Sequence, residues 1–169
     1  MKKPLVSNRV LLIDDKKGTA TQGVQAPNYV RVGKGFTNFG KAGNSTVDQK
    51  FYIDESGYGT SNKTGMQTIY SLTGDRIVGD PANDFIAGCY EGLGDDVITT
   101  AIQYDEYAPV TGSAGSYEAK KFECMVNCTN DGSGDGGGVL AVEAEIHQNG
   151  KAIKGVYNPT TRTFTADSE

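Results

Sequence analysis

The chain has few of the residues on which catalytic and metal sites depend. It holds a single histidine, His147, and no tryptophan among its 169 residues. A catalytic dyad or triad based on histidine, or a metal site with two histidines, is therefore hard to assemble within one chain. The sequence also shows no phosphate-binding loop, dinucleotide fingerprint or nucleophile elbow. We accordingly expect no catalytic residue, no cofactor and no bound metal.

Cysteine is scarce as well, and its spacing argues against disulfides and against zinc. Cys124 and Cys128 lie four residues apart in one expected strand, so their Cα atoms should be about 13 Å apart at ~3.3 Å per residue. A disulfide requires less than about 7 Å. Both share a strand face with Val126, and we predict that they are small buried apolar side chains. A Cys₃His site that includes Cys89 is disfavoured, because His147 should lie on the opposite strand face.

Long apolar runs are also missing. The run at residues 10–13 is far too short for a signal-peptide core or a membrane span. We therefore expect no targeting signal and no membrane partner.

The carboxylates do not form a convincing site either. Residues 131–136 match positions 1, 3, 5 and 6 of a calcium-binding loop, but position 12, which requires a bidentate Glu, is Val142. A polar hairpin tip explains this stretch better. Three other acidic pairs are adjacent in sequence, as turn residues often are, and would point to opposite faces of a strand: Asp14–Asp15, Asp54–Glu55 and Asp95–Asp96.

The residues that are abundant favour a loop-rich β protein. The chain contains 23 Gly and 9 Tyr, and 37% of its residues are hydrophobic. This composition supports a core, but a small one. Burial against identical neighbours would supplement it, which makes an oligomer plausible.

Period-two alternation predicts about eight strands. In the clearest segment, Leu140, Val142 and Ile146 share one face, whereas Glu143 and Glu145 share the other. Residues 129–138 hold five Gly and are expected to be an irregular hairpin connection. The expected strands are residues 29–34, 49–53, 66–73, 97–104, 117–128, 139–147, 152–157 and 161–166.

One α-helix is expected at residues 81–92. Asp80 is placed to cap it, and Pro81 suits the first helical position. An apolar stripe should pack the helix on a sheet, even though Gly88 costs about 1 kcal/mol relative to Ala. The stripe consists of Phe85, Ile86, Cys89 and Leu93.

Two segments do not fit a compact domain, although the whole chain, residues 1–169, is expected to form one. Residues 1–27 are interpreted as an N-terminal arm. Residues 40–65, with five Gly, are interpreted as a long loop that reaches a neighbouring subunit.

The charges are distributed unevenly along the chain. Residues 1–50 carry nine Lys or Arg against three acids, and residues 51–169 carry seven against eighteen. This asymmetry suits head-to-tail self-association. A solvated basic face explains it equally well. A nucleic-acid-binding arm is less favoured, because the cations are spread too thinly for a basic patch.

Four short motifs occur in an order that resembles that of the major tail proteins (tail-tube proteins) of siphophages that infect Gram-positive hosts. Residues 29–39 read Y-V-R-V-G-K-G-F-T-N-F, and residues 50–55 read K-F-Y-I-D-E, as in that family. Residues 115–119, G-S-Y-E-A, begin a strand as in the family, and residues 149–165 fit its closing hairpin. The likeness runs over roughly residues 5–166. Tyr29 stands where a Trp is expected.

The resemblance implies a mainly β fold, a tail-tube β-sandwich of about eight strands with one flanking helix. It also implies a structural virion protein without enzymatic activity, in which six subunits close a ring around a β-barrel lumen and the rings stack into a tube. Genomic DNA would pass through this lumen without sequence-specific binding. Implied partners are further copies of the chain, a tape-measure protein, and tail initiator and terminator proteins. The place implied is the virion tail, assembled in the host bacterial cytoplasm.

Two groups of residues are candidates for roles in such a tube. An acidic lumen would repel DNA and keep it mobile, and Glu143 and Glu145 are candidates to line it. Candidates for contact between rings lie in the 40–65 loop: Lys41, Lys50, Tyr52, Asp54, Glu55 and Tyr58.

Two alternatives stay open. One is the inner tube protein of a contractile tail or tailocin, which uses a related subunit. The other is a monomeric β-sandwich that binds carbohydrate or a cell-wall partner, which the many Tyr residues keep plausible.

Overall fold

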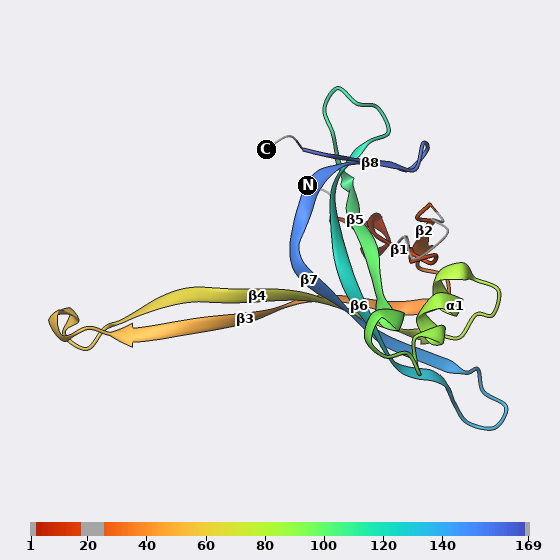
Figure 1. Cartoon of the computed structure of the whole chain (residues 1–169), viewed down its shortest axis with the longest axis horizontal. Helices are drawn as coiled ribbons and strands as arrows, with labels where there is room; N and C mark the ends of the chain where they lie inside the picture. The colour runs from red at the N-terminus through yellow and green to blue at the C-terminus, as the bar shows by residue number, and fades with distance from the viewer. Residues whose placement is uncertain (1–2, 18–25, 168–169) are drawn as a thin grey trace.

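The computed structural model describes residues 3–17 and 26–167 (Figure 1). The strands form one antiparallel sheet in the order β2-β1-β5-β6-β7-β4-β3, and β8 pairs with β7. This confirms the mainly β fold of about eight strands with a flanking helix. The elements are η1 (Val6–Asn8), β1 (Arg9–Asp14), β2 (Tyr29–Val32), β3 (Phe36–Phe51), η2 (Ile53–Glu55), β4 (Gly59–Asp75), α1 (Pro81–Gly88), η3 (Gly94–Val97), β5 (Ile98–Pro109), β6 (Tyr117–Ser133), β7 (Ala141–Asn158) and β8 (Thr163–Ala166).

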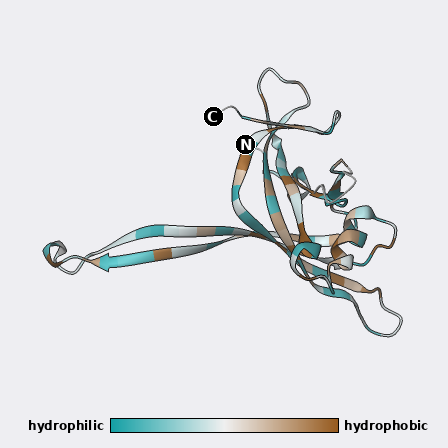
Figure 2. Ribbon diagram, viewed as in Figure 1, coloured by the Kyte–Doolittle hydropathy of each residue, from teal (hydrophilic) through white to brown (hydrophobic). Residues whose placement is uncertain are grey.

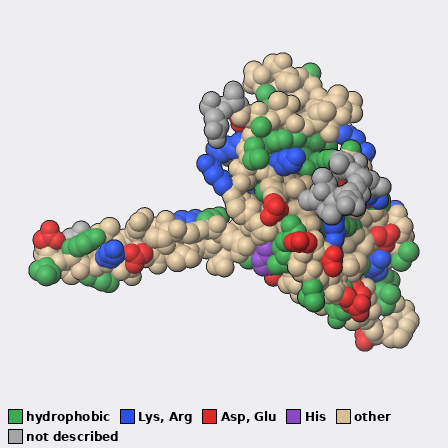
Figure 3. Space-filling view, viewed as in Figure 1, with side chains coloured by type: hydrophobic (Ala, Val, Ile, Leu, Met, Phe, Trp, Pro, Cys, Tyr) green, Lys and Arg blue, Asp and Glu red, His purple; other side chains and the backbone are tan. Residues whose placement is uncertain are grey.

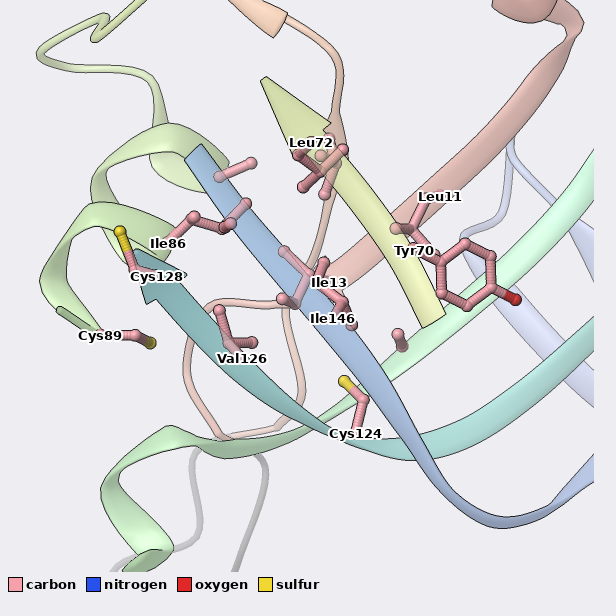
Figure 4. Close-up of a cluster of buried hydrophobic side chains, with 14 of the residues drawn as sticks. Leu11, Ile13, Tyr70, Leu72, Ile86, Cys89, Cys124, Val126, Cys128 and Ile146 are labelled. Atoms are coloured by element: carbon pink, nitrogen blue, oxygen red, sulfur yellow. The ribbon is translucent and has the colours of Figure 1, made fainter. Parts of the chain in front are cut away.

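The sheet folds over itself, so that strands from its two ends share one core. Leu11 and Ile13 of β1 lie in the same buried cluster as Tyr70 and Leu72 of β4 (Figure 4). Three strands, β5, β6 and β7, lie between β1 and β4 in the sheet order. Ile86 of α1 closes this cluster and is fully buried. A sandwich-like core thus forms within a single hydrogen-bonded sheet.

A second, smaller core lies on the other face of β1. Val10 and Leu12 pack there with Ile102, Tyr104 and neighbouring residues, while Leu11 and Ile13 point into the main core. A strand buried on both faces is apolar throughout, without alternation. The interpretation of residues 1–27 as an arm was therefore wrong for residues 9–14, which form a central strand. Residues 18–25 of that segment lie outside the described part of the chain.

Most of residues 40–65, interpreted from sequence as a long inter-subunit loop, are regular strand, and their contact with another subunit remains a prediction. β3 and β4 form a two-stranded ribbon that projects far from the body (Figure 1). Its strands pair continuously from Gly40 opposite Ser71 to Phe51 opposite Gly59, with one irregularity near Val47. Because the distal ribbon has no buried face, its sequence shows no strong alternation. Cross-strand backbone hydrogen bonds hold it together.

Other boundaries differ from those expected. The helix ends at Gly88, with Cys89 as its C-cap, and does not continue to residue 92. β6 extends through Ser133, into the segment expected to be irregular. The two strands expected at 139–147 and 152–157 are one continuous strand, β7. It contains a bulge, in which residues 150–152 lie opposite a single residue of β6. Gly150 supports this bulge with φ of +66°.

Two local predictions are confirmed. The carboxylate of Asp80 accepts a hydrogen bond from the backbone N–H of Asn83 at 3.0 Å, which caps α1. Val142, Ala144 and Ile146 are buried, as their alternation indicates. None of the helices in residues 3–17 and 26–167 is long and apolar enough to cross a bilayer.

Candidate assembly surfaces

The cysteines belong to the core and not to a reactive site. Cys89, Cys124 and Cys128 are free and buried (Figure 4). Burial raises the pKa of the Cys124 thiol to about 12 and that of Cys89 to about 11. Thiols with such pKa values stay protonated at neutral pH and are poor nucleophiles.

His147 points away from these thiols. Its Nε2 lies 3.2 Å from a carboxylate oxygen of Glu145. Among the described residues, no three His, Cys, Asp or Glu side chains are grouped so that they could hold a metal ion. The features that remain to be explained are surfaces, edges and projections.

The first such feature is the tip of the ribbon, where large apolar side chains are exposed. Figure 2 shows a few hydrophobic positions along a ribbon that is otherwise mostly hydrophilic or neutral. Ile53 is fully exposed, and Tyr58 and Phe51 are 80% and 65% exposed. Tyr52 is 51% exposed. Large apolar side chains that gather at the end of a projection mark a site of interaction.

The predicted contact residues of this region occupy different parts of the ribbon. Lys50, Tyr52, Asp54 and Tyr58 lie at or near its tip, where Lys50 forms an exposed ion pair with Asp48 at 3.5 Å. The side chain of Glu55 lies outside the described part. Lys41 is instead at the base of the ribbon, where its Nζ donates a hydrogen bond to the side-chain oxygen of Gln103 in β5 at 2.7 Å.

The second feature is the outer face of the β6-β7-β4-β3 part of the sheet. Glu145 lies opposite Ser71 of β4 and Asn127 of β6, and Glu143 lies opposite Thr73. We call this surface the acidic face. Its residues include three acids and no Lys or Arg: Asn38, Gly40, Ala42, Ile69, Ser71, Thr73, Glu123, Met125, Asn127, Glu143, Glu145 and His147. Apart from the acids, the side chains near its centre are small and polar.

The third feature is a pair of open strand edges. In its body portion, residues 36–42, β3 pairs only with β4, and β6 pairs only with β7 beyond Met125. No other strand in the described part of the chain bonds to either edge. Open edges expose unpaired N–H and C=O groups and pair readily with another chain. Sequence reasoning missed them, because strand order leaves no local signal.

Neither known protein families nor curated proteins match the chain in sequence. Its fold, however, is similar to that of solved structures. One is a chain described as "Virion of native gene transfer agent (GTA) particle", with a TM-score of 0.59, 10% identity, and coverage of 97% of this chain and 100% of that one. A second, "Tail of empty GTA particle computed with helical refinement, C6 symmetry", has a TM-score of 0.56, 10% identity and the same coverage.

A third similar structure comes from a different kind of assembly. It is an extracellular contractile injection system, "PVC sheath/tube terminator in extended state", with a TM-score of 0.51 and 9% identity over 91% of this chain and 97% of that one. At such identities the likeness establishes a shared fold over nearly the whole chain, and function must be argued from the surfaces described above.

Proposed function

We propose that this chain is a structural tail-tube subunit that polymerises as stacked hexameric rings and carries out no catalysis. The observation that carries this proposal is the ribbon, whose apolar tip stays exposed among the residues that the structure describes. The open edges and the acidic face support the same conclusion. So does the shared fold, because one similar structure is a tail with C6 symmetry.

Ring closure follows from the two open edges. They bound the same four-stranded part of the sheet, so the β3 edge of one copy can pair with the β6 edge of the next. Antiparallel or parallel ladder bonds would then satisfy the backbone groups that each copy leaves open. A closed ring of such sheets is a barrel without free edges.

The acidic face would line the channel of that barrel. Phosphates bind Lys and Arg strongly, and a lumen without cations would let DNA move freely. Glu143 and Glu145 would repel the duplex and keep it away from the wall. Genomic DNA is thus proposed as a passing cargo, with no sequence-specific contacts.

The ribbon would connect successive rings. Its apolar tip, with Phe51, Ile53 and Tyr58, would be buried against a copy in the adjacent ring, which removes apolar surface from water. A tape-measure protein, an initiator and a terminator would set the length of such a tube, in a virion tail assembled in the host bacterial cytoplasm. The motifs at residues 29–39 and 50–55 favour a long non-contractile tail of a phage with a Gram-positive host.

The inner tube of a contractile tail is the second candidate. Similarity to the sheath/tube terminator of a contractile injection system favours it. Both candidates share the ring, the lumen and the stacking described above.

The proposal is tested by electron microscopy of the concentrated purified protein. We expect hollow tubes built of stacked rings with six-fold symmetry. A protein that stays monomeric up to millimolar concentrations and binds cell-wall polysaccharide would contradict the proposal and support a carbohydrate-binding sandwich.

The role of the acidic face is tested separately. Glu143→Lys combined with Glu145→Lys should leave tubes intact but slow DNA ejection from reconstituted particles, because phosphates would bind the new cations. A matched control is Lys151→Glu, at an exposed position of β7. Ejection at the unchanged rate through normal tubes would remove these two residues from the lumen.

A further inference from the structure

A polar cleft lies at the base of the ribbon, between β3 and the parts of β5, β6 and β7 that bend away from it. Its volume is about 700 Å³. Three lysines from three different strands line it, Lys41, Lys120 and Lys154, together with the Arg9–Asp105 pair. Figure 3 shows Lys and Arg side chains gathered above the base of the ribbon.

The lysines in this cleft oppose one another. Lys120 lies directly opposite Lys154 in the β6–β7 ladder, and like charges in that arrangement destabilise a sheet. The ammonium group of Lys41 extends into the same space. Partial burial, Arg9 and Lys120 lower its pKa.

No described carboxylate lies within ion-pair distance of these three lysines, although the charge of Asp105 acts on Lys41. No ion pair within 4.0 Å involves any of them. Asp105 is already engaged, because Arg9 donates to it at 2.8 Å. Glu118 and Asp167 also line the cleft but form no ion pair with the lysines. Like charges therefore face each other at Lys120 and Lys154, and no ion pair among the described residues offsets them.

The opposite end of the molecule carries the complementary charge. Residues 122–150 include five acids and no Lys or Arg. The β6–β7 hairpin projects at the end away from the ribbon (Figure 1). Asp131 and Asp135, at its glycine-rich tip, are exposed. A narrow acidic projection and a cationic cleft at opposite ends fit a head-to-tail contact between identical copies.

We propose that the cleft of one copy receives the β6–β7 hairpin of a copy in the adjacent ring, with Asp131 and Asp135 paired to Lys41, Lys120 and Lys154. This inference rests on the proposed tube and names a contact between its rings that is separate from the ribbon tip. The contact makes head-to-tail stacking of rings the favoured arrangement. In the two other arrangements, cleft would face cleft or hairpin would face hairpin, and like charges would repel.

Charge reversal tests the contact. Lys120→Glu with Lys154→Glu, or Asp131→Lys with Asp135→Lys, should each raise the subunit concentration needed for tubes roughly ten-fold or more. Combining all four substitutions should restore assembly, because the charges are then exchanged and not lost. Circular dichroism and thermal unfolding check that each subunit is folded. Lys151→Glu, outside the cleft, is the matched control and should assemble normally.

Carbodiimide cross-linking gives a readout that does not depend on tubes. In concentrated protein, it should join Asp131 or Asp135 to Lys120 or Lys154, and a mixture of isotopically labelled and unlabelled chains should show that the bond is between copies. Absence of this cross-link, or failure of the four-fold variant to recover assembly, would overturn the hairpin as occupant. A wild-type protein that forms the cross-link but no tubes would instead contradict the proposed tube.

Discussion

The two halves of β4 belong to one strand and one ladder with β3, but they have opposite surroundings. The proximal half pairs with both β3 and β7 and buries Tyr70 and Leu72 to 1% and 2% exposure. The distal half pairs with β3 alone, and Met66 on it is 58% exposed. An isolated two-stranded hairpin is marginally stable in water. The distal ribbon therefore has the features of a segment that is stabilised by a partner, while the proximal half stabilises the subunit.

Removal of the distal ribbon should produce the largest effect. Deleting residues 45–66 and joining Asn44 to Gln67 through an Asn-Gly turn keeps the proximal pairing and the contact of Lys41 with Gln103. We expect a folded, soluble subunit that forms no tubes at any accessible concentration. Circular dichroism and electron microscopy measure the two results, and long tubes from this variant would contradict a stacking role for the ribbon.

The two halves of β4 should also contribute unequally to the stability of the subunit. Leu72→Ala should lower the free energy of unfolding by about 2–5 kcal/mol, because it leaves a cavity in the main core. Met66→Ala, six residues away in the distal half, should change it by less than about 0.5 kcal/mol. Urea denaturation of both variants decides the matter. Equal losses would show that the distal half packs against the body in solution.

The tip of the ribbon should affect assembly and leave the subunit intact. Phe51→Ser with Ile53→Ser removes apolar surface that a neighbour would bury, and should raise the concentration needed for tubes about ten-fold, since 1.4 kcal/mol corresponds to that factor. Sedimentation of tubes measures it. Asn62→Ser, at an exposed polar position on the ribbon, is the control. An unchanged threshold in the double variant would place the contact elsewhere on the ribbon.

A cysteine substitution on the ribbon should have the smallest effect on the subunit. Thiol labelling then compares the exposure of the ribbon with that of the core. Burial raises the pKa of Cys124 to about 12, so at pH 8 its thiol is protonated as well as shielded. A cysteine introduced as Ser61→Cys on the exposed ribbon should react with iodoacetamide rapidly, whereas Cys124 should react only after unfolding. Mass spectrometry distinguishes the two sites. Rapid modification of Cys124 in the native subunit would contradict a closed core.

Local patterns in the sequence predicted the parts of the fold that have one buried face. The alternation around Val126 and Ile146 indicated which side chains enter the core, and the structure confirms both. Asp80 and Pro81 marked the start of α1 correctly. The candidate residues Lys50, Tyr52, Asp54 and Tyr58 do lie together near one end of the ribbon, and their contact with another copy remains a prediction. So does the position of Glu143 and Glu145 in a lumen.

The sequence pattern predicted the wrong structure for strands that have two buried faces or none. The sequence predicts residues 10–13 as part of an arm, because a strand that packs into two cores shows no alternation. The sequence predicts a loop at residues 40–65, because a ribbon without a buried face carries glycines and polar residues as a loop does. Periodicity reports burial on one side and is silent in both of these cases.

The amino-acid sequence alone indicated that the chain is rich in β-strands and which strand faces point inward. It also indicated where the helix begins, that the thiols are buried and that charge is distributed unevenly. Which strands are neighbours, and hence which edges stay open, depended on the folded chain. The same holds for the cleft, where lysines from β3, β6 and β7 meet although more than a hundred residues separate Lys41 from Lys154. Strand pairing uses backbone groups that every residue carries, so the partner of a strand is selected by long-range packing and leaves no mark in its local sequence.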